Sequence, residues 1–213
     1  MSLSAADFNL YLDTEFLEAR TCGEVIKELA NVPHNPATVY GAHAAGAIDE
    51  AVRKTIRLVP SAKTVERITA KLIEARGVIA AHFGIELTKC EEPQLLRYGV
   101  GDFFVAHQDG NTGMMLSERE QFRKVSVVIF LNRQSPDCNS DDSPDHATDD
   151  SSLTDDSYSG GSLVFTEWRA GRNRGQYSLS AGPGTLVAFP AETTHEVTPV
   201  TAGTRYSIVS WYG

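Results

Sequence analysis

From residue 94 to the end of the chain, short apolar and β-branched stretches follow one another closely, and this pattern constrains the fold most strongly. Glycine and proline mark turns between them, as in Gly160-Gly161 and Gly182-Pro183-Gly184. Strands are expected at 94–98, 103–107, 125–132, 162–165, 177–180, 185–189, 195–197 and 204–211. About eight short strands in roughly 120 residues are typical of an antiparallel barrel or a double-sheet jelly roll.

The first 93 residues have a mainly helical pattern instead. Apolar side chains recur at helical spacing over 14–29, and a longer helix is expected over 61–83. Ser61 is a suitable N-cap for the longer helix, and Gly84 is a suitable C-terminal stop. A helix with one apolar stripe is expected to pack on a sheet. The stripe comprises Val65, Ile68, Leu72, Ile73 and Ile79.

These two patterns predict a single domain that is mainly β with flanking helices. Residues 94–213 are expected to form a double-stranded β-helix, or jelly roll, as the core. Residues 1–93 are expected to form a helical lead-in that braces this core within the same domain. A chain of 213 residues with 41% hydrophobic residues is long and apolar enough for such a core.

The net charge of −9 is concentrated in one segment of the chain. Residues 137–157 contain eight Asp and no Lys or Arg, so 19 basic and 20 acidic residues remain elsewhere. Segment 135–159 has too few apolar residues to offset the entropy cost of ordering it, and we expect a flexible acidic insertion there. The rest of the chain lacks the basic face that a nucleic acid partner requires.

No sequence feature indicates a membrane partner or export. No stretch approaches the ~20 consecutive apolar residues of a membrane span, and the first residues show no secretory signal pattern. Cys22, Cys90 and Cys138 are odd in number and far apart, which is typical of free thiols in a reducing compartment. We therefore expect a cytoplasmic protein, and its oligomeric state stays open.

Two histidines and one aspartate are candidate metal ligands. In an extended strand residues i and i+2 face the same side, so His107 and Asp109 could reach one metal ion together. His195 follows a second apolar strand, which stops at Pro190. Two histidines and one carboxylate suit non-haem Fe(II) with open coordination positions. Taken alone, the His-x-Asp pair is more typical of a surface histidine and a turn aspartate.

Arg205 is a candidate for binding an anion. It lies ten residues after His195, in an alternating strand that points Arg205 and Ser207 to the same face. A buried arginine needs an anionic partner, and its guanidinium fits a carboxylate well. That carboxylate could belong to a bound molecule or to an acidic residue of the protein, and the strand pattern leaves both open.

The order and spacing of these stretches resemble those of the 2-oxoglutarate and Fe(II)-dependent dioxygenase superfamily. Within it, the chain is most similar to the prolyl 4-hydroxylase alpha-subunit catalytic domain. The resemblance covers about residues 94–211, over half of the chain. The matching stretches are 95–110, 127–132, 160–165, 184–190, the His-Glu-Val segment at 195–197 and the strand that begins near Arg205.

The resemblance implies a role for each candidate residue. His107, Asp109 and His195 match the ligands of Fe(II), and Arg205 matches the basic residue that pairs with the distal carboxylate of 2-oxoglutarate. The cofactors implied are Fe(II), 2-oxoglutarate and O2 as cosubstrates, and ascorbate as a further expectation.

Two hydroxyl groups are implied as further cosubstrate contacts. Tyr98 matches a tyrosine that hydrogen-bonds to 2-oxoglutarate, and an ordinary aromatic at a strand end is the alternative. Ser207 could add a hydroxyl to the distal carboxylate or be a plain strand serine. The position of Arg205 usually holds lysine in collagen-type prolyl hydroxylases, which weakens collagen-like proline as a substrate.

The implied reaction is hydroxylation of an unactivated C–H bond, with release of succinate and CO2. The substrate we expect is a prolyl or other side chain of a protein or peptide. One alternative is a hydroxylase of a free amino acid or another small molecule. The other is a non-catalytic jelly-roll module that binds or senses a ligand and retains the metal.

Overall fold

The regular elements of the computed structural model are short strands and helices. The described residues are 3–30, 32–37, 51–110, 122–135, 157–167 and 175–213. The helical elements are the 3-10 helix η1 (Ala5–Phe8), α1 (Ala19–Leu29) and α2 (Ala62–Phe83). The first strands are β1 (Tyr11–Asp13), β2 (His34–Pro36), β3 (Arg53–Lys54), β4 (Ile56–Leu58), β5 (Gln94–Tyr98), β6 (Phe103–His107) and β7 (Val125–Phe130). The later ones are β8 (Tyr158–Gly160), β9 (Leu163–Thr166), β10 (Gln176–Leu179), β11 (Leu186–Pro190), β12 (His195–Val197), β13 (Val200–Gly203) and β14 (Arg205–Tyr212).

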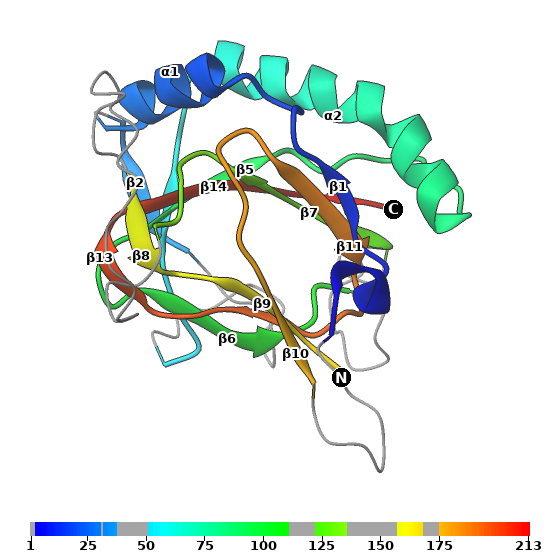
Figure 1. Cartoon of the computed structure of the whole chain (residues 1–213). Coiled ribbons are helices and arrows are strands. Elements are labelled where there is room, and N and C mark those ends of the chain that lie inside the picture. Colours follow the sequence, from blue (N-terminus) through cyan, green and yellow to red (C-terminus); the bar gives the residue numbers. More distant parts are fainter. Residues whose placement is uncertain (1–2, 31, 38–50, 111–121, 136–156, 168–174) are drawn as a thin grey trace, which may run out of the picture.

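Two antiparallel sheets face each other, and the helices cover the outer face of the larger one (Figure 1). The larger sheet has seven strands in the order β1-β11-β7-β14-β5-β4-β2. The smaller sheet has five, in the order β10-β9-β12-β6-β3, and β13 pairs separately with β8. This is the mainly β jelly-roll core with flanking helices that the sequence predicts.

Helix α2 forms because its ends are capped and one stripe is apolar. The Ser61 side chain accepts a hydrogen bond from the Thr64 backbone N–H, and Gly84 ends the helix in the left-handed region with φ 65°. Leu72 and Ile79 are fully buried against the outer face of the larger sheet. The prediction was wrong for Ile73, whose side chain is 50% exposed, since it lies beside the stripe rather than in it.

Alternation along the strands of the larger sheet separates two cores. In β11, Leu186 and Ala188 pack in the cluster beneath the helices, whereas Val187 and Phe189 pack between the two sheets. Because both faces are covered, all six residues of β7 are buried. Inner-facing positions of these strands are therefore available to build an interior site.

All eight predicted strands are present, with ends shifted by no more than two residues. The first 93 residues also contribute strands: β1 pairs with β11, β4 with β5, and β3 with β6. Each of these added strands has only two or three residues, too few for a periodic pattern to stand out. Among the described residues, no helix is long and apolar enough to cross a membrane.

The expected acidic insertion lies largely in 136–156, outside the described residues. Its two flanks are held together, because the Ser135 N–H donates to the Tyr158 carbonyl at 2.8 Å and the Tyr158 N–H donates to the Arg133 carbonyl at 3.1 Å. Residues 158 and 159, at the end of the expected insertion, belong to β8. The two flanks of the expected insertion therefore lie side by side.

Tyr212→Phe is expected to lower the free energy of unfolding by about 1 kcal/mol. The buried Tyr212 hydroxyl donates to the Leu72 carbonyl of α2 at 2.6 Å and so joins the last strand to the helix. Urea denaturation measures the change. Tyr206→Phe, on the same strand and without a hydrogen bond from its hydroxyl among the described residues, is the control. Equal stability of the two variants would contradict this role.

Candidate functional site

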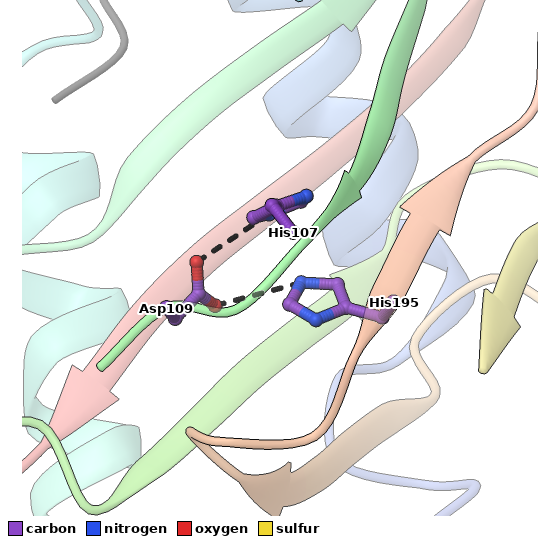
Figure 2. A group of neighbouring side chains, drawn as sticks. All are labelled: His107, Asp109 and His195. Atoms are coloured by element: carbon purple, nitrogen blue, oxygen red, sulfur yellow. Dashed lines mark ion pairs between the residues drawn. The ribbon is translucent and has the colours of Figure 1, made fainter. Parts of the chain in front are cut away.

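Three side chains predicted as metal ligands lie together between the sheets (Figure 2). One ligand atom of each lies within 4.8 Å of the other two. His107 Nε2 is 3.5 Å from one carboxylate oxygen of Asp109, and His195 Nε2 is 3.6 Å from the other. His107 ends β6, Asp109 follows it, and His195 begins β12.

Strand pairing brings the two histidines together. His195 stands directly opposite His107 in the antiparallel pairing of β12 with β6, and their ring centroids are 4.2 Å apart. The register then shifts, because Val197 stands opposite Phe104. One extra residue in β6 is a β-bulge, and the two residues between Phe104 and His107 are exposed. Directly opposed residues of an antiparallel pair point to the same face, so both rings face the interior. The bulge lies beyond them and brings Phe104 to the same face as His107.

Hydrogen bonds orient all three side chains. Nδ1 of His107 and Nδ1 of His195 lie 2.8 Å and 2.9 Å from the backbone carbonyl oxygen two residues earlier. A carbonyl only accepts, so each Nδ1 carries the proton and each Nε2 turns its lone pair toward the site. The Ser126 hydroxyl donates to Asp109 Oδ2 at 2.7 Å.

The charge states of the buried pair suit metal binding. Burial, together with the neighbouring His107, lowers the pKa of His195 to about 4, so its imidazole is neutral at pH 7. Burial alone would raise the pKa of Asp109, but the two histidines outweigh it and hold that pKa well below its usual range. A neutral imidazole and an ionised carboxylate are the forms that bind metal ions.

Arg205 is fully buried on β14, with 1% of its surface exposed. Its Nη1 donates to the Ser207 hydroxyl at 2.9 Å, and its guanidinium carbon lies 5.1 Å from the ring centroid of Tyr98, which stands opposite Arg205 on β5. Within the described part of the chain no carboxylate pairs with Arg205, and its Nε has no hydrogen-bond partner. A buried guanidinium without an anion is unfavourable, so this environment is suited to a bound carboxylate.

One cavity of about 560 Å³ connects the two groups of residues. It is lined by His107, Asp109, His195, Tyr98, Arg205 and Ser207. Its walls also carry apolar side chains such as Leu96, Val128 and Leu163. The structure thus brings together all six predicted site residues in one space large enough for a small organic ligand.

The donor set of this cavity fits Fe(II). Two imidazoles and one carboxylate are the ligands of the facial triad, which leaves positions for other ligands. Carboxylate and imidazole also bind other divalent metals, but the buried cationic side chain of Arg205 beside the triad suits an anionic cosubstrate. No third histidine or cysteine joins the group among the described residues.

Two supporting side chains were not predicted. Ser126 is the single polar residue in the apolar run 125–130, and a buried hydroxyl there is a signal that sequence analysis could have used. Arg123 forms a two-pronged ion pair with Glu91, with N···O distances of 2.6 Å and 3.0 Å, and its guanidinium lies 3.8 Å from the ring centroid of Trp211. Its Nη1 also donates to the Asp109 carbonyl at 3.4 Å.

Solved prolyl hydroxylases share this fold. A prolyl-4-hydroxylase from Pseudomonas putida superposes with a TM-score of 0.64 over 98% of this chain and 94% of its own, at 19% sequence identity. A prolyl hydroxylase from Trichoplax adhaerens, in complex with a hypoxia inducible factor peptide fragment, has a TM-score of 0.64 at 17% identity and covers 98% and 84% of the two chains. At these identities the likeness shows a common fold.

Sequence comparison covers the C-terminal part of the chain. A PKHD-type hydroxylase from Cupriavidus pinatubonensis is 30% identical over 120 residues, which are 56% of this chain and 41% of that protein. A PKHD-type hydroxylase from Shewanella sp. strain ANA-3 is 39% identical over 119 residues, again 56% and 41% of the two chains. The chain thus spans about two fifths of the length of these relatives.

The family model for the 2OG-Fe(II) oxygenase superfamily matches residues 93–213. This region is more than half of the chain and contains the triad, the buried arginine and both hydroxyl groups beside it. This match shows that the chain belongs to the 2OG-Fe(II) oxygenase superfamily, and the jelly-roll fold agrees with this assignment.

Proposed function

We propose that the protein is an Fe(II)- and 2-oxoglutarate-dependent dioxygenase that hydroxylates a prolyl or other side chain of a protein or peptide. The observation that carries the proposal is one cavity that holds both a His-Asp-His cluster and a buried arginine, with which no carboxylate of the described residues pairs. In the balanced reaction, one oxygen atom of O2 enters succinate and the other enters the substrate hydroxyl, and CO2 leaves from 2-oxoglutarate.

His107, Asp109 and His195 would hold the iron in this proposal. Bound there, Fe(II) supplies the activation of O2 that is coupled to decarboxylation of 2-oxoglutarate and to attack on the C–H bond. The chain's own part is to keep both Nε2 lone pairs and the carboxylate directed at one point, through the carbonyls behind each histidine and Ser126 behind Asp109.

Arg205 would bind the distal carboxylate of 2-oxoglutarate. Its charge is buried, its Nε lacks a partner among the described residues, and Ser207 already orients its Nη1. Tyr98 offers a hydroxyl on the opposing strand. These groups fix the cosubstrate before reaction, so less orientational freedom is lost in the transition state.

The apolar side chains in the cavity walls favour a carbon-rich substrate group. The shared fold with solved prolyl hydroxylases favours a prolyl side chain, and this choice remains part of the proposal. Dependence on ascorbate stays a prediction, and assays with and without ascorbate measure it. A free amino acid or another small molecule is the alternative substrate class that a screen must include.

With Fe(II) and O2, the purified protein is expected to convert 2-oxoglutarate to succinate. In the absence of the molecule to be hydroxylated, this conversion should be slow. His107→Ala should abolish this conversion, because it removes one of three metal ligands and leaves the metal with too few. Succinate is measured by chromatography and CO2 by release of label from 1-¹⁴C-2-oxoglutarate. His82→Ala, at the exposed C-terminal end of α2, is the control. Full activity of the His107 variant would place the metal elsewhere.

Arg205→Gln is expected to raise the KM for 2-oxoglutarate about 10- to 100-fold, because a hydrogen-bonded charge pair contributes about 1.5–3 kcal/mol. Ser207→Ala should raise it less, by roughly threefold to tenfold, since a neutral hydroxyl contributes about 0.5–1.5 kcal/mol. Steady-state kinetics at varied 2-oxoglutarate measure both constants. An unchanged KM in the arginine variant would rule out the proposed carboxylate contact.

A substrate screen separates the two substrate classes. Proline-containing peptides are expected to accelerate succinate formation and to gain one oxygen atom, seen by mass spectrometry as an increase of about 16 Da from hydroxylation of a C–H bond. Free proline and other free amino acids at the same concentrations form the second arm. Hydroxylation confined to a free amino acid would overturn the peptide substrate while leaving the reaction type intact.

A further inference from the structure

An aromatic stack lies directly behind one of the proposed iron ligands. The rings of Phe104 and His107 are nearly parallel, with an interplanar angle of 18° and centroids 3.5 Å apart. On β3, Arg53 stands opposite Phe104, and its guanidinium carbon lies 4.6 Å from the centroid of the same ring. Arg53, Phe104 and His107 all line the cavity.

The stack depends on the β-bulge in β6. Residues three apart in a regular strand face opposite sides, so Phe104 and His107 could not stack without the extra residue between them. The carbonyl of Val105, inside the bulge, also accepts the His107 Nδ1–H at 2.8 Å. The bulge therefore provides both contacts that hold the His107 ring, one at its edge and one at its face.

The two proposed histidine ligands differ in how much packing surrounds them. The His195 side chain is 6% exposed, and the Phe189 ring meets it edge-on with centroids 4.7 Å apart. The His107 side chain is 17% exposed and lies on the more open side of the site. A ligand ring must keep its orientation within about 10–20° to bind well, so His107 depends more on the flat ring beside it.

We propose that Phe104 is a positioning residue that holds the His107 imidazole in its metal-binding orientation, and that Arg53 strengthens this effect by stacking on Phe104. The inference rests on the proposed metal site and adds two residues that act through a ligand. It makes metal affinity depend on the short edge strand β3, which contributes no ligand itself.

Co(II) binding to the purified protein, measured by calorimetry and by visible absorption, tests the proposal. Phe104→Leu keeps an apolar side chain but removes the flat ring, and it is expected to weaken Co(II) binding at least about tenfold, as loss of a supporting contact does at other metal sites. Phe104→Tyr keeps the ring and should bind Co(II) like the parent protein. Arg53→Met should weaken binding about threefold, the size of a partly exposed cation–π contact.

Arg57→Met is the matched control for the arginine. Arg57 also lines the cavity from the neighbouring strand β4, but its guanidinium forms an ion pair with Glu92 at 3.9 Å and does not stack on a ring among the described residues. The Co(II) affinity of the Arg57→Met variant should equal that of the parent protein. Thermal melting of the metal-free variants tests whether each one folds.

Three outcomes would overturn the inference. Parent-like Co(II) affinity in Phe104→Leu would show that the ring does not position His107. Equal losses in the leucine and tyrosine variants would show an effect of packing volume alone. A parent protein that binds no Co(II) would overturn the proposed metal site and the inference with it, whereas the first two results leave that site standing.

Discussion

The antiparallel pairing of β12 with β6 is the interaction on which the site depends. It sets His195 opposite His107, although the two residues are far apart in the chain. Backbone pairing of the two strands is what brings these histidines together. The larger sheet adds the Arg205 side chain from the opposite wall, and the two helices keep that sheet buried on its other face.

Much of this arrangement can be predicted from sequence because it follows from short-range patterns. Most of the eight core strands are short apolar or β-branched stretches with glycine or proline nearby, and the long helix has Ser61 and Gly84 at its ends. The triad and Arg205 lie at the ends of such strands or just beyond them, and family resemblance indicates their roles. Their burial in one cavity is then a consequence of the two-sheet fold.

Other features escape prediction for physical reasons. The strands β1 to β4 are too short to carry a period and form only because the core sheets offer unpaired edges. The β-bulge in β6 changes which residues face inward, and nothing in the local sequence requires it. The exposure of Ile73 on α2 is also hard to predict from sequence, because it depends on where the sheet lies and not on the apolar character of the side chain.

The backbone contacts between Ser135 and Tyr158 have a consequence for how this chain can vary. Tyr158 exchanges one backbone hydrogen bond with Ser135 and one with Arg133, so the two ends of the intervening segment are fixed close together. The entropy of closing such a loop grows only with the logarithm of its length, by about 0.6 kcal/mol for each doubling. A change in the number of residues between these fixed ends would therefore lower the stability of the jelly roll only slightly.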